Sequence, residues 1–149
     1  MNTIRRKLNP LRKPWALSGS MAMKMHANRA GVQLHRKPND IDIVVRPQDF
    51  ELFVRTLAKI GYTLDGPPPI NYRKTRHLKL YKGNNSIDLL QARSNLAPNI
   101  RRNNINVFNK KTPLVKLRHL IYQKKSALNN FDNAKTRSNY NFLIKLPRD

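Results

Sequence analysis

The sequence predicts a single α/β (α+β) domain in which a mixed β-sheet is flanked by helices. The 149 residues suffice for one hydrophobic core and hardly for two. Apolar residues make up 39 % of the chain. They alternate at the two-residue period of strands in some stretches and recur at helical spacing in others. The predicted order of turn, helix, strand, helix, hairpin and helix indicates a mixed sheet.

The first thirty residues predict a basic arm, a strand and a helix. Residues 1–14 carry five Lys and Arg and no acid, and we expect an arm that is ordered only in part. Trp15 to Leu17 form a candidate strand that leads into the turn Ser18-Gly19-Ser20. The Ala- and Met-rich run 21–30 favours a helix, which Gly31 would end.

A strand and an amphipathic helix follow. The β-branched run from Ile41 to Val45, bounded by Pro38 and Pro47, is typical of a strand. After Pro47, apolar residues recur at helical spacing until Gly61, which predicts a helix over this segment.

The rest of the chain predicts a hairpin and two helices. His77–Lys82 alternates apolar and basic residues, and SIDLLQA follows after a Gly- and Asn-containing turn, as in a β-hairpin. Thr112-Pro113 suits the start of a helix that runs to about Lys125. Further expectations are a short strand at 106–108 and, after the polar and Asn-rich stretch 126–138, a last short helix at 139–146. The predicted divisions are the arm 1–14, a core 15–105 and a basic helical segment 106–149 of the same domain.

Two aspartates stand in an apolar strand. In HRKPNDIDIVV, Asp40 and Asp42 are two residues apart, so both side chains leave the strand on one face. Asp88 lies within the apolar run of a later strand. If these strands are neighbours, three carboxylates converge, although like charges 4 Å apart repel by roughly 4 kcal/mol at an effective dielectric near 20. Hard oxygen ligands suit Mg²⁺ or Mn²⁺, so the pattern predicts a metal site.

The alternative for these aspartates is structural. The chain has 30 Lys and Arg against eight Asp and Glu, so each aspartate has many candidate ion-pair partners. One aspartate alone would fit that interpretation. A D-x-D strand with a third aspartate on another strand favours the metal.

The turn Ser18-Gly19-Ser20 feeds directly into a predicted helix. Free backbone N–H groups and the positive end of the helix dipole suit a phosphate at such a position. Gly-Ser turns are common, so this signal gains weight only beside the D-x-D strand and Asp88.

The formal net charge of +22 indicates a polyanionic partner. Both termini are candidate nucleic-acid contacts, and the alternative is a solvated, flexible tail. No apolar run approaches the roughly 18 residues that span a bilayer, and the chain has no cysteine, which fits a reducing compartment. We therefore expect a cytoplasmic protein without a membrane partner.

The stretches LSGSMAMKMH, RKPNDIDIVV and SIDLLQA resemble the DNA polymerase β-like nucleotidyltransferase superfamily. In that superfamily a Gly-Ser turn and helix precede a D-x-D strand, and a third Asp lies on an adjacent strand. The resemblance covers roughly residues 15–92. The A-M-x-x-H helix and the R-x-P-x-D-I-D opening are most similar to small bacterial enzymes of the abortive-infection and toxin type, which modify tRNA.

The resemblance implies a role for each motif residue. Gly19 and Ser20 would bind the β- and γ-phosphates of a nucleotide. Asp40, Asp42 and Asp88 would hold two divalent ions, and Asp88 would help to deprotonate the attacking hydroxyl. Lys124 or Lys125 would be the phosphate-binding lysine of a later helix. Two departures from the toxin type are a longer spacer between the turn and the D-x-D strand and the absence of an acid after Lys135.

The function that follows is transfer of a nucleoside monophosphate (NMP) from a nucleoside triphosphate (NTP) to an acceptor hydroxyl. RNA is the expected acceptor, with a tRNA 3′ end as one candidate, and a neutralising protein partner is a further expectation. One alternative is an inactive nucleic-acid-binding protein with the same fold. Another is a basic ribosomal-type structural protein, which leaves the three aspartates unexplained.

Several lesser residues have two interpretations each. His26 on the predicted helix is a packing or surface residue rather than a catalytic one. His77 is either a phosphate contact or a solvated strand residue. Tyr72, Tyr81 and Tyr122 stand among Lys and Arg, where they suit base stacking or ordinary packing.

Overall fold

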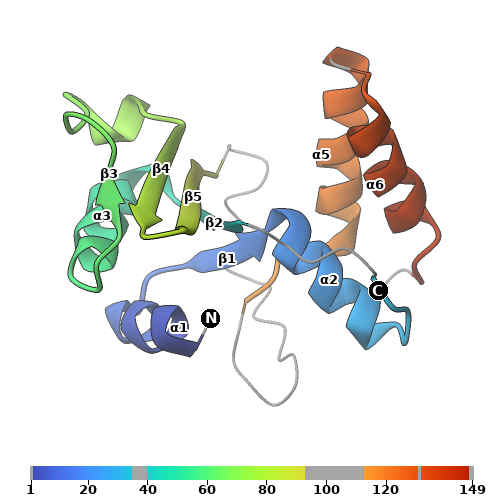
Figure 1. The fold of residues 1–149 in the computed structure, drawn as a ribbon, viewed down its shortest axis with the longest axis horizontal. Coiled ribbons are helices and arrows are strands. Elements are labelled where there is room, and N and C mark those ends of the chain that lie inside the picture. Colours follow the sequence, from blue (N-terminus) through green and yellow to red (C-terminus); the bar gives the residue numbers. More distant parts are fainter. Residues whose placement is uncertain (1, 35–39, 93–112, 131, 148–149) are drawn as a thin grey trace.

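A computed structural model of the chain describes residues 2–34, 40–92, 113–130 and 132–147. It shows a five-stranded mixed sheet in the order β1-β2-β5-β4-β3, with helices at both sides (Figure 1). The strands are β1 (Trp15–Ser18), β2 (Ile41–Val45), β3 (Thr63–Leu64), β4 (His77–Lys82) and β5 (Asn85–Gln91). The helices are α1 (Asn2–Leu8), α2 (Gly19–Arg29), α3 (Phe50–Ala58), α5 (Leu117–Asn130) and α6 (Ala134–Ile144). Single 3-10 turns are η1 (Asn9–Leu11), η2 (Pro47–Asp49) and η3 (Tyr72–Lys74). The predicted fold class is confirmed.

The pairing of β2 with β5 is parallel, and the other pairings are antiparallel. In this register Asp42 is the partner of both Ser18 on β1 and Asp88 on β5. On the other side of β5, Lys79 of β4 is the partner of Asp88. The register therefore brings Ser18, Asp42, Asp88 and Lys79 into one row across four adjacent strands.

The hydrophobic core lies on one face of the sheet and packs against α3. Phe50, Phe53 and Leu57 form the apolar stripe of α3 and are fully buried with Ile43 and Leu89 of the central strands. Burial of each such side chain contributes about 1.5–3 kcal/mol. The helix predicted after Pro47 is thus confirmed, with η2 as its first turn.

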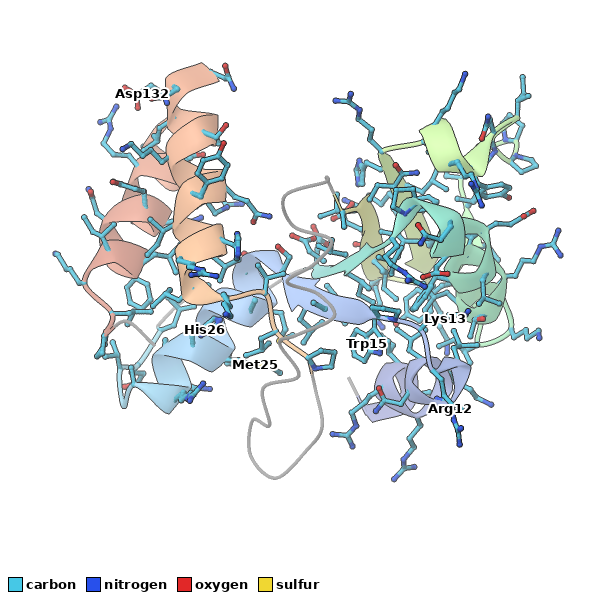
Figure 2. All side chains as sticks on the ribbon, turned by 180° about the vertical axis from the view of Figure 1, so that it is seen from behind. Arg12, Lys13, Trp15, Met25, His26 and Asp132 are labelled. Carbon is cyan, nitrogen blue, oxygen red and sulfur yellow. The ribbon has the colours of Figure 1, made fainter. Side chains whose placement is uncertain are left out.

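The prediction of a partly ordered N-terminal arm is wrong for residues 2–8, because they form helix α1. Ile4 and Leu8 lie four residues apart on one side of it and are buried in the core, and α1 contacts α3. The Trp15 Nε1 atom donates a hydrogen bond to the side-chain oxygen of Asn9, 3.2 Å away. Arg12, Lys13 and Trp15 lie at the α1 end of β1 (Figure 2). A two-residue apolar stripe is a weak signal in a segment dominated by charge.

The C-terminal segment differs from the prediction at both of its ends. Residues 113–115 first run along β1, where the Leu17 N–H donates to Pro113 O at 2.9 Å and the Val115 N–H donates to Leu17 O at 2.8 Å. Helix α5 therefore begins at Leu117, four residues after Pro113.

The polar, Asn-rich stretch 126–138 is largely helical, because α5 extends to Asn130 and α6 begins at Ala134. The Asn133 side chain caps α6 by accepting a hydrogen bond from the Thr136 N–H at 2.8 Å. Asn-rich sequence favours turns, but here the two helices pack against one another as a hairpin (Figure 1). The short strand expected at 106–108 lies outside the described residues, and β3 was not predicted. Among the helices in the described ranges, none has the length and apolar character needed to cross a bilayer.

Candidate active site

Asp40, Asp42 and Asp88 come together on one face of the sheet. Asp42 and Asp88 are register partners on adjacent parallel strands, and their carboxyl groups share a hydrogen bond. Burial, the charge of Asp88 and its hydrogen bond, and the charge of Asp40 together raise the pKa of Asp42 from 3.8 to about 6, and burial is the largest of these causes. The Lys124 charge acts against them and lowers it. The structure therefore brings Asp42 and Asp88 together as expected, with the charge of Asp40 nearby.

Asp88 and Asp40, the carboxyl neighbours of Asp42, have further polar partners. Asp88 Oδ1 lies 2.6 Å from His77 Nε2 of β4. Asp40 Oδ1 accepts a hydrogen bond of 2.6 Å from the Ser86 hydroxyl, and its other oxygen is 3.7 Å from Lys79 Nζ. The structural alternative thus holds in part, because Asp40 has a lysine beside it. Asp42 has two carboxyl neighbours and the charge of Lys124 instead.

The chemistry of this cluster fits a hard divalent cation. Within the ranges that the structure describes, no group of three or more His, Cys, Asp or Glu side chains is already arranged around a metal position. Asp88 is turned toward His77 and Asp40 toward Ser86. Asp42 and Asp88 are nevertheless register partners with hydrogen-bonded carboxyl groups, an arrangement that a proton or a cation must stabilise. Carboxylate oxygens are the ligands that Mg²⁺ and Mn²⁺ prefer.

The Ser18-Gly19-Ser20 turn lies directly against Asp42. Gly19 has a φ of +60°, and a Cβ built there would overlap the Asp42 carboxylate. Only glycine meets both conditions at low cost, because it lacks a Cβ and tolerates positive φ. Ser18 does not cap α2 with its side chain and instead donates from its hydroxyl to Gln123 Oε1 of α5, 3.3 Å away. The first N–H groups of α2 thus begin immediately beside the aspartates, as expected for a phosphate-binding turn.

The later helix contributes Lys124 rather than Lys125. Lys124 is close enough to lower the pKa of Asp42, whereas the side chain of Lys125 is exposed. Gln123, which was not predicted, links α5 to Ser18. Lys124 and Gln123 of α5 therefore border the aspartate cluster on its β1 side.

The β4 residues His77 and Lys79 were not assigned to the aspartates from the sequence. A signal was available, because the two-residue turn Gly83-Asn84 fixes the hairpin register and places Lys79 opposite Asp88. His77 then lies diagonally across from Asp88, within reach of its carboxylate.

His26 has a structural role, as the sequence favoured. Its side chain is buried on α2, and Nε2 lies 2.7 Å from the backbone oxygen of Val115, just before α5 begins. Figure 2 shows His26 between these two segments. The residue therefore joins α2 to the C-terminal helices rather than facing the aspartates.

Neither a protein-family model nor a curated protein sequence matches the chain. Solved structures do match it. One is ANT(2'')-Ia in complex with adenylyl-2''-tobramycin, with a TM-score of 0.70 and 11 % identity over 95 % of this chain and 84 % of that one. Another is the lincosamide antibiotic adenylyltransferase LnuA with bound lincomycin, with a TM-score of 0.69 and 14 % identity over 98 % and 95 %. A third is TM1012 from Thermotoga maritima, with a TM-score of 0.61 and 15 % identity over 93 % and 88 %.

These similarities show the fold. The chain has the DNA polymerase β-like nucleotidyltransferase fold that its motifs resemble. The matches cover nearly the whole chain, so the C-terminal helices also have counterparts in these structures.

Proposed function

We propose that this protein is a metal-dependent nucleotidyltransferase that moves an NMP from an NTP to an acceptor hydroxyl and releases pyrophosphate. The observation that carries the proposal is the contact between Asp42 and Asp88 directly beside the Gly19 turn. This contact supports a cation site next to a phosphate site, and the fold of the chain is that of nucleotidyltransferases.

Each residue has a defined part in this reaction. Gly19 and Ser20, at the start of α2, bind the β- and γ-phosphates through backbone N–H groups. Asp40, Asp42 and Asp88 would hold Mg²⁺ or Mn²⁺, which when bound neutralises triphosphate charge and activates the acceptor oxygen. Lys124 adds positive charge on the α5 side.

The transfer itself exchanges one P–O bond for another. The acceptor oxygen bonds to the α-phosphorus, and the bond from that phosphorus to the β-phosphate oxygen breaks, so pyrophosphate leaves with the electron pair. Asp88 takes the proton of the acceptor hydroxyl. His77 keeps the Asp88 carboxylate oriented through their 2.6 Å contact.

RNA is the acceptor class that the charge supports best, with a tRNA 3′ end as a candidate. A net charge of +22 attracts polyanions and repels polycations such as aminoglycosides. The matched structures carry an adenylylated aminoglycoside and a lincosamide, so an antibiotic is the competing acceptor. A cytoplasmic location and a neutralising protein partner, as for toxin-type enzymes, belong to the same proposal.

The test is incubation with each α-³²P-labelled NTP and total cellular RNA in the presence of Mg²⁺ or Mn²⁺. We expect one RNA band to gain label with the wild type and none with Asp40→Ala or Asp42→Ala. Asp65→Ala, which removes an exposed acid from a loop, is the matched control and should retain transfer. Unchanged labelling by Asp42→Ala would refute the proposal.

The alternative is an inactive nucleic-acid-binding protein with this fold. Thermal unfolding with Mn²⁺ and each NTP separates the two, because a binding-only protein should gain no stability from the nucleotide. A nucleotidyltransferase should gain stability from at least one NTP, and this gain should disappear in Asp42→Ala.

A further inference from the structure

Strand β4 presents a row of three side chains next to the aspartates. Alternate residues of a strand share a face, so His77, Lys79 and Tyr81 lie on one side of β4. The contacts of His77 with Asp88 and of Lys79 with Asp40 show that this is the side that bears the carboxylates. Leu80 on the opposite side is fully buried in the core. The row therefore lies on the same face of the sheet as the aspartates.

The strand order separates this row from the phosphate-binding turn. Across the sheet, Ser18 of β1 is followed by Asp42 of β2, Asp88 of β5 and then Lys79 of β4. If the NTP phosphates lie against Gly19 on the β1 side, the acceptor must reach Asp88 from the other side. The β4 row is the surface that it would meet there.

The row combines exposed positive charge with an aromatic ring. The exposed fractions are 51 % for the His77 side chain, 38 % for the Lys79 side chain and 40 % for Tyr81. Lys79 Nζ lies 5.9 Å from the centre of the Tyr81 ring. A cation beside an exposed aromatic face suits a phosphate next to a stacked base.

The surrounding sequence is free of competing acids. No acidic residue occurs between Asp65 and Asp88, and the segment has five Lys and Arg, which are Arg73, Lys74, Arg76, Lys79 and Lys82. A polycationic acceptor would meet only like charge here until it reached the aspartates. A single nucleic-acid strand would meet charge complementarity along the row.

We propose that His77, Lys79 and Tyr81 form the acceptor-binding strip, and that the acceptor is a single-stranded nucleic acid. Lys79 contacts a backbone phosphate and Tyr81 stacks on a base, while His77 holds Asp88 for the terminal hydroxyl. This inference rests on the proposed function and specifies the acceptor side of the same site.

The test measures binding of a fluorescent single-stranded RNA by anisotropy, in an Asp42→Asn background that cannot transfer. We expect Tyr81→Ala to weaken binding by about tenfold and Tyr81→Phe to restore it, because the ring provides the stacking. Lys79→Ala should reduce the slope of log K against log salt by about 0.7, the value for one phosphate contact on a single strand.

The matched control is Lys82→Ala. Lys82 belongs to the same strand and carries the same charge, but it lies on the opposite side, with Nζ 5.7 Å from the Tyr62 ring centre. It should leave the salt slope unchanged. Equal effects of Lys79→Ala and Lys82→Ala would overturn the strip, because they would indicate that RNA responds to overall charge alone. The absence of measurable RNA binding would also overturn it.

Failure of the strip and failure of the proposed function are distinguishable. If wild-type protein labels an aminoglycoside or a lincosamide, and Lys79→Ala and Tyr81→Ala transfer to it normally, transfer stands and the strip is wrong. If wild-type protein transfers NMP to no acceptor, the proposed function is wrong, whatever the binding assay shows.

Discussion

The two sides of the aspartate cluster differ in how closely the chain approaches it. On the β1 side, Gly19 leaves no room for a Cβ against Asp42, and Ser18 is buried and bonded to Gln123 of α5. On the β4 side, His77 and Lys79 approach Asp88 and Asp40 with half-exposed side chains. A closely fitted backbone suits a ligand of fixed size such as a triphosphate. An open row of long side chains suits a polymer whose end alone must reach the site.

Gly19→Ala tests the closed side and should have the largest effect. The added Cβ overlaps the Asp42 carboxylate, so one of them must move. Misplacement of a reacting group by about 1 Å can cost about 100-fold in rate, and we expect at least that loss of transfer in a steady-state assay. Gly31→Ala is the control, because Gly31 also has a positive φ of +73° but nothing within 4 Å of its added Cβ. If both variants lose activity equally, backbone strain rather than the contact with Asp42 is responsible.

His77→Ala tests the open side and should have a smaller effect. Asp88 would lose the partner that orients it. Loss of such an outer contact typically costs about 10–100-fold. We expect about a tenfold lower kcat with the KM for NTP unchanged, and recovery in His77→Gln, whose amide can donate to the same oxygen. A raised KM for NTP with unchanged kcat would place His77 on the nucleotide side and contradict the comparison.

The effect of Asp42→Asn on the free energy of unfolding should be the smallest of these effects, although the same variant is expected to lose transfer. The folded-state pKa of Asp42 is raised from 3.8 to about 6, so the folded protein holds this proton more tightly than the unfolded chain. Between pH 3.8 and about pH 6, the free energy of unfolding falls as pH rises. Above about pH 6, Asp42 is charged in the folded protein, and the full destabilisation is present. Because Asp42 is partly solvated, this cost is about 1 kcal/mol.

Asparagine cannot ionise, so the variant should be more stable than wild type at pH 8 and equally stable below pH 4. Urea unfolding without metal at both pH values measures this difference. A variant that is less stable at pH 8 would show that Asp42 is not crowded by its carboxyl neighbours.

The cluster could be predicted from the sequence because its signals are local. Asp40 and Asp42 share a face by strand geometry, and Asp88 needed only the assumption that its strand is adjacent. The β4 contacts depend on hairpin register, which the Gly83-Asn84 turn encodes. The sequence therefore encodes these contacts as well, through a turn that lies between the two strands.

Other parts depend on distant packing that one sequence does not encode locally. Helix α1 is held by Ile4, Leu8 and a Trp15–Asn9 hydrogen bond, so its order depends on a core formed by later residues. The extension of α5 and the start of α6 similarly rest on contact between two weakly patterned helices. Local propensity does not indicate these helix ends, because Asn and Ser prefer turns when no partner helix is considered.

The most direct test of the central claim is Mn²⁺ uptake followed by electron paramagnetic resonance of the free ion. Wild-type protein at pH 8 should bind Mn²⁺, and Asp42→Asn should lose this binding while Asp65→Asn retains it. Equal uptake by wild type and Asp42→Asn would contradict the account, since the three aspartates would then not be the residues that hold the ion.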